Sequence, residues 1–151
     1  MATKDFTTNQ SGAAFQAEKV MWKPYRFDMS GNLPSGSAAA AADGDTVRLL
    51  KLEPYSRVIG FQSEICTAEP TTLCLAFGIS GTCLTDADGL DAAVSGCAAA
   101  GTLAFGVAGT DAAIGKSTGQ CGAYITMYTC GISCTLVGKI GATIVRDKDH
   151  V

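Results

Sequence analysis

Alternation between apolar and polar residues is the dominant pattern along this chain, and it predicts short β-strands. In residues 72–79 every second side chain is large and apolar, whereas the residues between them are small or polar. No long segment has apolar residues spaced three and four apart, as a packed helix would. The segments with strand character are 46–52, 57–66, 72–79, 103–107, 123–130 and 132–145. Six or seven short strands with glycine-rich turns predict an all-β fold, an antiparallel β-sandwich.

The alternation also predicts which side chains face the core. In 57–66 we expect Ile59, Phe61 and Ile65 on one face. Within 132–145, Gly138 and Gly141 indicate a bulge or a close approach of another backbone. The core-facing residues expected in that last strand are Ile132, Cys134, Leu136, Ile140 and Ile144.

The first 30 residues differ from the rest of the chain. Residues 1–18 are polar, which is typical of an extended arm. Residues 19–29 are rich in aromatic side chains, and Pro24 excludes a central strand, so an edge strand or an anchored arm is expected. We therefore predict an N-terminal arm over 1–30 and a sandwich domain over 31–151. Within that domain, we predict a loop over 80–101 that could hold a short helix at 88–100.

Composition favours a protein that packs against other proteins. Charged residues make up only 17% of the chain, and its net charge is −3. Residues 58–115 contain no Lys or Arg but six acidic residues, while the first 57 residues carry seven of the eleven basic ones. This distribution argues against a nucleic-acid partner and fits docking onto a complementary protein surface. A secretory signal is not expected, because no apolar segment follows Lys4 and Asp5. A membrane span is not expected either, because the uncharged stretch 92–110 has few large side chains and 117–138 alternates polar and apolar residues.

Seven cysteines are many for 151 residues. No C-x-x-C pair is present, and the single histidine is His150, so neither zinc nor a catalytic thiol is indicated. Buried free thiols and disulfides both remain open, and the odd count leaves one thiol without an intramolecular partner. The pairs that lie close in sequence, and are therefore the candidate disulfides, are Cys66–Cys74, Cys83–Cys97 and Cys121–Cys130.

Two motifs partly match known ligand-binding sequences, one for phosphate and one for calcium. The G-K-S-T at 115–118 lacks the first glycine of a phosphate-binding loop, since Thr110 stands there. The D-A-D-G-L-D at 86–91 gathers three carboxylates, but Leu90 and Cys97 occupy positions at which an EF-hand needs ligands. An acidic turn is expected at 86–91, with a calcium loop of another kind as the alternative. We expect no cofactor and no enzymatic activity.

Aromatic residues next to basic ones are typical anchors at protein interfaces. An alternative is that they only cover one end of the sandwich. The candidate contact residues in the N-terminal part are Phe6, Phe15, Trp22, Tyr25, Arg26 and Phe27.

Several segments in order resemble a known family. They are A-D-G-D-T-V-R-L-L-K-L-E-P-Y-S-R-V-I-G-F at 42–61, T-T-L-C-L-A-F-G-I-S-G at 71–81, D-G-L-D at 88–91, G-Q-C-G-A-Y-I-T-M at 119–127 and G-K-I-G-A-T-I-V at 138–145. Together they resemble the head decoration, or cement, proteins of tailed bacteriophages over about residues 40–146. The seven cysteines, and Glu53 before Pro54, depart from the pattern of that family.

The resemblance implies a jelly-roll-like sandwich that is made in the host cytoplasm and carried on the capsid surface of the virion. It implies a homotrimer that clamps neighbouring subunits of the major capsid protein and has no catalytic centre. The alternatives are a tail or neck structural protein, and a surface module that binds a carbohydrate or a host receptor. A module of that last kind needs an exposed aromatic platform or a metal-organised loop.

Overall fold

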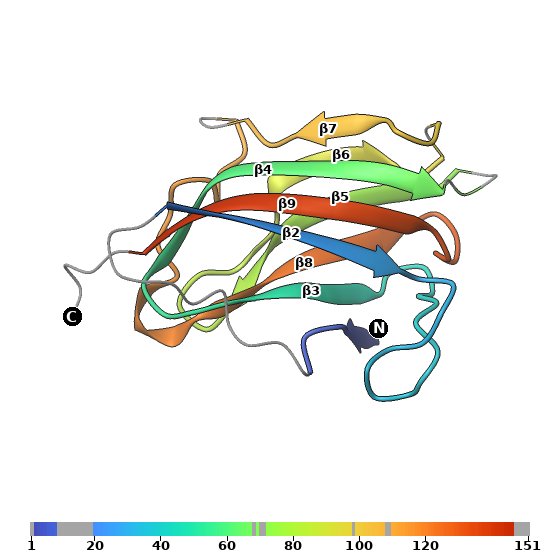
Figure 1. Ribbon diagram of the computed structural model, residues 1–151, viewed down its shortest axis with the longest axis horizontal. Helices are drawn as coiled ribbons and strands as arrows, with labels where there is room; N and C mark the ends of the chain where they lie inside the picture. Colours follow the sequence, from blue (N-terminus) through green and yellow to red (C-terminus); the bar gives the residue numbers. More distant parts are fainter. Residues whose placement is uncertain are drawn as a thin grey trace.

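The computed structural model describes residues 2–8, 20–67, 69, 72–97, 99–107 and 110–146. These residues form two sheets packed face to face (Figure 1). The strands are β1 (Thr3–Asp5), β2 (Val20–Asp28), β3 (Thr46–Leu52), β4 (Ser56–Thr67), β5 (Cys74–Gly81), β6 (Asp86–Ser95), β7 (Leu103–Phe105), β8 (Ala123–Cys130) and β9 (Val137–Arg146). One short 3₁₀ turn, η1 (Gly119–Cys121), precedes β8.

The strand order is that of a jelly roll. One sheet has the order β2-β9-β4-β7, and we call it the β4 sheet. The other has the order β1-β3-β8-β5-β6, and we call it the β8 sheet. From β2 to β9 the chain crosses repeatedly between the two sheets, as it does in two-sheet jelly rolls. The expectation of an all-β sandwich is confirmed.

Large apolar side chains from both sheets form one core between the layers. The alternation expected in β5 is confirmed, because Leu73, Leu75, Phe77 and Ile79 are all buried. Other strands of both sheets, and the segment just before β9, contribute the remaining large side chains of the core, which include Phe27, Val47, Leu49, Val58, Phe61, Ile65, Leu90, Ile125, Met127, Leu136, Ile140 and Ile144. Burial of this much apolar surface is the main term that stabilises the fold.

The prediction of a loop and short helix over 80–101 is wrong for most of that segment. Residues 86–95 form β6, an edge strand paired with β5. The pairing shifts register twice, and a Cβ on Gly78 would lie 2.1 Å from the backbone oxygen of Asp86. These irregularities break the period-two pattern, so alanine, aspartate and glycine in this segment indicate a loop when the sequence is read alone.

The expected face of Ile59 is also wrong. A β-bulge between Val58 and Gly60 turns Val58 into the core and leaves Ile59 45% exposed. A bulge inserts one residue and therefore reverses the sides of the residues before it. Phe61 and Ile65 lie in the core as expected.

The arm expected over 1–30 is not seen in the described parts of that range. Residues 3–5 pair in parallel with β3, and residues 20–28 form an edge strand antiparallel to β9. The edge-strand alternative for the aromatic segment is therefore the correct one, as Pro24 requires. Residues 9–19 lie outside the described residues.

The two glycines of β9 are sites of close approach, but aromatic rings rather than another backbone approach them. A Cβ on Gly138 would lie 2.7 Å from the ring of Phe27, and one on Gly141 would lie 2.2 Å from the ring of Trp22. Two aromatic side chains of β2 therefore pack directly on the β9 backbone, from opposite sides of the β4 sheet. In the described part of the chain no helix has the length and apolar character that a membrane crossing requires.

Candidate interaction surface

The structure separates the predicted contact residues into two groups. Phe6 and Phe27 are buried, and Tyr25 is half-buried against the core. Trp22 and Arg26 point outward from β2 and are exposed. Phe15 lies outside the described residues. Of the described candidates, Trp22 and Arg26 are exposed, and Tyr25 is partly accessible from the surface.

Phe6 and Tyr25 close one side of the sandwich. Their rings meet edge to face, with centroids 6.3 Å apart. Because Phe6 follows β1 in the β8 sheet and Tyr25 lies in β2 of the β4 sheet, this pair connects the two layers. Phe6 is therefore a packing residue, while half-buried Tyr25 both packs on it and lines a surface pocket with Arg26 and Lys139.

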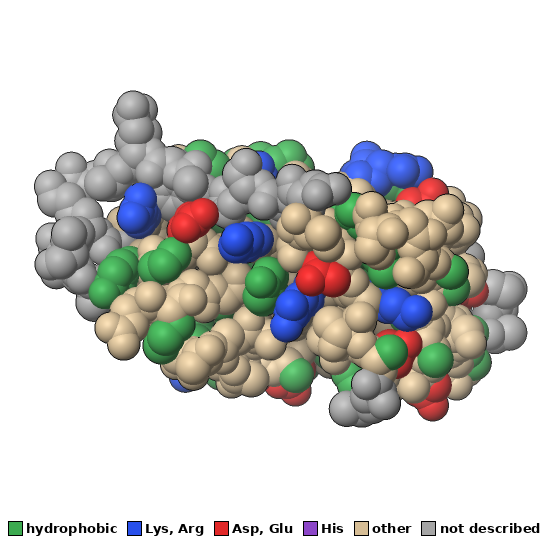
Figure 2. Space-filling view, turned by 90° about the horizontal axis from the view of Figure 1, so that it is seen from below, with side chains coloured by type: hydrophobic (Ala, Val, Ile, Leu, Met, Phe, Trp, Pro, Cys, Tyr) green, Lys and Arg blue, Asp and Glu red, His purple; other side chains and the backbone are tan. Residues whose placement is uncertain are grey.

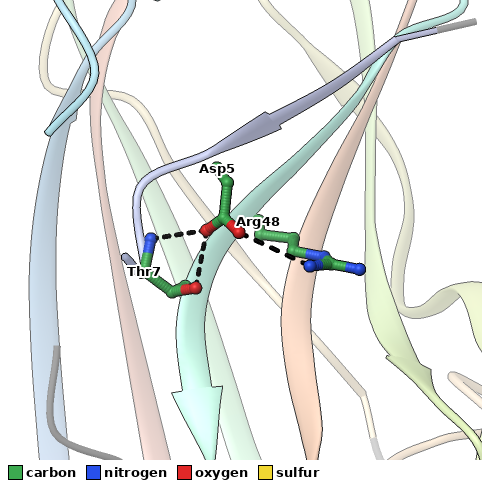
Figure 3. A network of polar contacts seen from close by, with 3 residues as sticks. All are labelled: Asp5, Thr7 and Arg48. Atoms are coloured by element: carbon green, nitrogen blue, oxygen red, sulfur yellow. Dashed lines mark hydrogen bonds and ion pairs between the residues drawn. The ribbon is translucent and has the colours of Figure 1, made fainter. Parts of the chain in front are cut away.

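Polar contacts hold β1 at the edge of its sheet (Figure 3). The backbone N–H and the hydroxyl of Thr7 donate to one carboxylate oxygen of Asp5 at 2.7 and 2.6 Å. Arg48 of β3 approaches the other oxygen at 3.4 Å. Partial burial by itself would raise the pKa of Asp5, but the two Thr7 donors and the Arg48 guanidinium together lower it.

Asp45 fixes the chain just before β3. Its buried carboxylate accepts the backbone N–H groups of Ala2 and Ala42, each at 2.8 Å. These two donors lower the pKa of Asp45, the Ala2 donor most. Asp45 therefore joins the N-terminal segment to the loop that leads into the β8 sheet.

The outer face of the β4 sheet carries the exposed large apolar side chains. Strand pairing places Phe105 beside Gln62 and Leu103 beside Glu64, so these β7 residues share the outer face with Trp22. Among the described residues, every large hydrophobic side chain that is clearly exposed belongs to this sheet or directly follows β7. They are Val20, Trp22, Ile59, Leu103, Phe105 and Val107. We call these six residues the apolar face.

The apolar face has a polar centre. Lys139 of β9 and Glu64 of β4 form an ion pair at 3.6 Å between the apolar edges provided by β2 and β7. Exposed apolar side chains gathered on one face around a polar strip are typical of protein-binding surfaces. Sequence reasoning named Trp22 and predicted a strand over 103–107, but it did not name Leu103 and Phe105 as contact residues. The alternation of such a short strand does not tell which side faces solvent.

The opposite outer face, on the β8 sheet, has a different character. Arg48 stacks over the ring of Tyr124 at 4.3 Å, and Tyr128 is half-buried beside small residues of β6. Figure 2 shows the edge of the sandwich at β1 and β3, where acidic and basic side chains lie close together among scattered hydrophobic ones. No large apolar side chain is clearly exposed on the described part of this sheet.

The three expected disulfide pairings are wrong. The structure pairs Cys74 with Cys130 and Cys83 with Cys121, and leaves Cys66, Cys97 and Cys134 free. The expectations Cys66–Cys74, Cys83–Cys97 and Cys121–Cys130 joined cysteines that are close in sequence. The order of strands in the sheet determines which cysteines pair. Because β5 lies beside β8, Cys74 is directly opposite Cys130.

The acidic segment 86–91 is part of β6 rather than a turn, so the expected acidic turn is wrong. Burial, reinforced by the negative charge of Asp111, raises the pKa of Asp91. Among the described residues, no group of three His, Cys, Asp or Glu side chains has the geometry of a metal site.

The fold is similar to that of chains in two phage capsid structures. Against a chain in the capsid of Ralstonia phage GP4, the TM-score is 0.71 with 14% identity, over 98% of this chain and 99% of that one. Against a chain in the Cyanophage Pam1 capsid asymmetric unit, the TM-score is 0.58 with 11% identity, over 93% of this chain and 96% of that one. Identities this low show a shared fold. No family model and no curated protein matches the sequence.

Proposed function

We propose that this protein is a structural component of a phage virion, which decorates the capsid and stabilises it by clamping neighbouring major capsid protein subunits. The observation that carries the proposal is the end-to-end likeness to a chain in the GP4 capsid, over 98% of this chain and 99% of that one. The likeness therefore extends over nearly the whole of both chains.

The apolar face is the surface that we assign to capsid contact. Trp22 and Phe105, at its two edges, are 49% and 57% exposed, and Arg26 lies on β2 with Trp22. Trp and Arg side chains are enriched among residues that dominate binding energy at interfaces. Opposite edges of one sheet are well placed to contact two subunits at once. Such a contact stabilises the assembled shell, because binding to the assembled state shifts the equilibrium toward it.

Two further parts of the proposal rest on the resemblance in sequence. The protein acts as a homotrimer on the outer capsid surface, and it needs neither a cofactor nor a catalytic residue. Light scattering on the purified protein measures the first part directly. A mass of three 15.4-kDa chains supports the trimer, and a monomeric mass at capsid-binding concentrations removes it from the proposal.

Co-sedimentation with purified capsids tests the assigned face. Phe105→Asp places a charge in the apolar face, and we expect it to weaken capsid binding about tenfold or more, which is about 1.4 kcal/mol. Ala92→Asp is the matched control, because it adds the same charge at an exposed β6 position on the other sheet. If both variants bind like the unchanged protein, the apolar face is not the contact surface. If the unchanged protein stays in the supernatant, the capsid proposal itself fails.

A further inference from the structure

Cysteine and serine side chains form a row across one end of the β8 sheet. Cys130 of β8 pairs directly with Cys74 of β5, and Cys74 pairs directly with Ser95 of β6. Residues directly opposite each other on neighbouring strands point to the same side of a sheet, here the outer side. Cys74 and Cys130 form a disulfide. The row therefore consists of a disulfide followed by a serine hydroxyl.

A free thiol continues this row. Cys97 is exposed, lies in the turn after β6, and has its Sγ 3.3 Å from the Oγ of Ser95. Cys97, Ser95 and Cys74 line the same surface recess of about 560 Å³, whose other walls include Leu73 and Val94. The nucleophile and the disulfide thus open into one mostly apolar recess.

The surroundings of Cys97 favour its thiolate. Hydrogen bonds from the Ser95 hydroxyl and from the backbone N–H of Leu73 lower the pKa of Cys97. Leu73 immediately precedes Cys74, so the second donor holds the sulfur next to the disulfide-bearing strand. Because the thiolate is the attacking species in exchange, both donors favour reaction at this position.

The other two free thiols do not share this arrangement. Cys134 is fully buried, and burial raises its pKa to about 11. Cys66 lies in β4, which belongs to the other sheet. Of the three free thiols, Cys97 is the one that lines a recess together with Cys74.

We propose that Cys97 is a nucleophilic thiol that exchanges with the Cys74–Cys130 disulfide. The thiolate of Cys97 attacks the Sγ of Cys74, so a Cys97–Cys74 bond forms while the Cys74–Cys130 bond breaks. Cys130 leaves as a thiolate and takes up a proton from water. The numbers of disulfides and free thiols are unchanged, so the step needs no oxidant or reductant.

The exchange changes which two segments of the β8 sheet region are joined by the disulfide bond. In one isomer the tie joins β5 to β8, and in the other it joins β5 to the turn that follows the edge strand β6. The second isomer releases the thiol of Cys130 on the outer face of the β8 sheet, away from the apolar face. The protein therefore has two covalent forms that differ in which thiol is presented.

Disulfide mapping on the folded, unreduced protein tests the proposal. The protein is incubated at about pH 8, where thiolates form, then quenched with acid, alkylated at its free thiols and mapped by mass spectrometry. We expect alkylated Cys130 together with a Cys74–Cys97 peptide. Cys97→Ser should lower Cys130 alkylation about tenfold or more, because the intramolecular nucleophile is gone. Cys66→Ser is the matched control and should leave the alkylation unchanged.

A second variant keeps the test decisive. Cys130→Ser leaves Cys74 without its partner, and after oxidation we expect Cys74 to pair with Cys97. The proposal is overturned if Cys130 alkylation in the unchanged protein is absent or persists in Cys97→Ser. It is equally overturned if Cys74 and Cys97 do not pair in Cys130→Ser.

Discussion

At the scale of single residues, the packing of Trp22 on Gly141 decides the shape of the apolar face. Only a residue without a side chain fits under the indole ring, since a Cβ at that position would lie 2.2 Å from it. The position of the Trp22 ring on β2 therefore requires a glycine at position 141 of β9. The sequence predicts a close approach at Gly141, but it does not identify Trp22 as the ring that makes it.

Replacing Gly141 with alanine should displace the indole ring. We expect Gly141→Ala to cost about 1–3 kcal/mol of unfolding free energy, as overpacking does. Trp22 is the single tryptophan of the chain, so a red-shifted emission maximum reports its movement directly. Gly60→Ala is the control, because its Cβ would meet Thr143 at 3.4 Å, an ordinary contact. Equal stability and emission in Gly141→Ala would contradict the packing described here.

Asp45 should make the unfolding free energy of the protein depend on pH in the acidic range. Its pKa is lowered in the folded state by the backbone N–H groups of Ala2 and Ala42. The carboxylate therefore stabilises the fold above its unfolded pKa of about 3.9 and loses that effect as the pH falls through the lower folded value. We expect Asp45→Asn to cost about 1–2 kcal/mol at neutral pH.

Urea unfolding at neutral pH and at about pH 3 measures this effect. The difference between the unchanged protein and Asp45→Asn should shrink at the lower pH, because protonation has already weakened the carboxylate contacts. A difference that is the same at both pH values would show that the charge of Asp45 is not responsible.

At the scale of elements, β1 is attached by few contacts and β5 by many. Three residues of β1 pair with β3, and Phe6 supplies the apolar contact that follows them. Elements held by few contacts open locally with a smaller free energy than the whole fold. The strand β1 should therefore be the first described element to separate from the sandwich.

Truncation of Phe6 should loosen β1 while the core stays formed. We expect Phe6→Ala to cost about 1–3 kcal/mol and Phe77→Ala, in the middle of β5, about 3–5 kcal/mol. Hydrogen exchange should rise in Phe6→Ala at the backbone N–H of Thr46 and Phe6, which bond Ala2 and Arg48. Protection lost equally across β5 and β8 would show that Phe6 belongs to the global core.

The strands that could be predicted are those whose alternation is unbroken. The bounds of β3 and β8 follow from their residues, and so do the buried faces of β5 and β9. Where a bulge intervenes, as at Ile59, the period-two rule assigns the wrong side. The β6 strand was missed because its pairing is irregular and its residues are typical turn formers.

The disulfides and the apolar face depend on strand order, which local sequence does not contain. Cys74 and Cys130 are 56 residues apart and meet only because β5 lies beside β8. Likewise, Trp22 and Phe105 share a face only because β2 and β7 belong to one sheet. Sequence reasoning could name Trp22 and Arg26 as exposed candidates, but it counted Phe6 and Phe27 with them although both are buried.

At the scale of the whole molecule, the two outer faces divide the functions that we propose. The β4 sheet presents apolar side chains around one ion pair, whereas the β8 sheet presents charged and aromatic groups and both disulfides. A protein with one adhesive face and one solvent-facing side is suited to lie flat on a large assembly. We therefore expect the β4 sheet, and not the β8 sheet, to contact the capsid.

An electron cryomicroscopy reconstruction of capsids with the bound protein measures this asymmetry most directly. We expect density for the sandwich on the outer surface of the shell, with the β4 sheet toward the capsid and Trp22 and Phe105 at the contact. The β8 sheet, with Tyr124 and Tyr128, should face solvent. Density in which the β8 sheet contacts the shell and the apolar face points to solvent would contradict the proposed orientation.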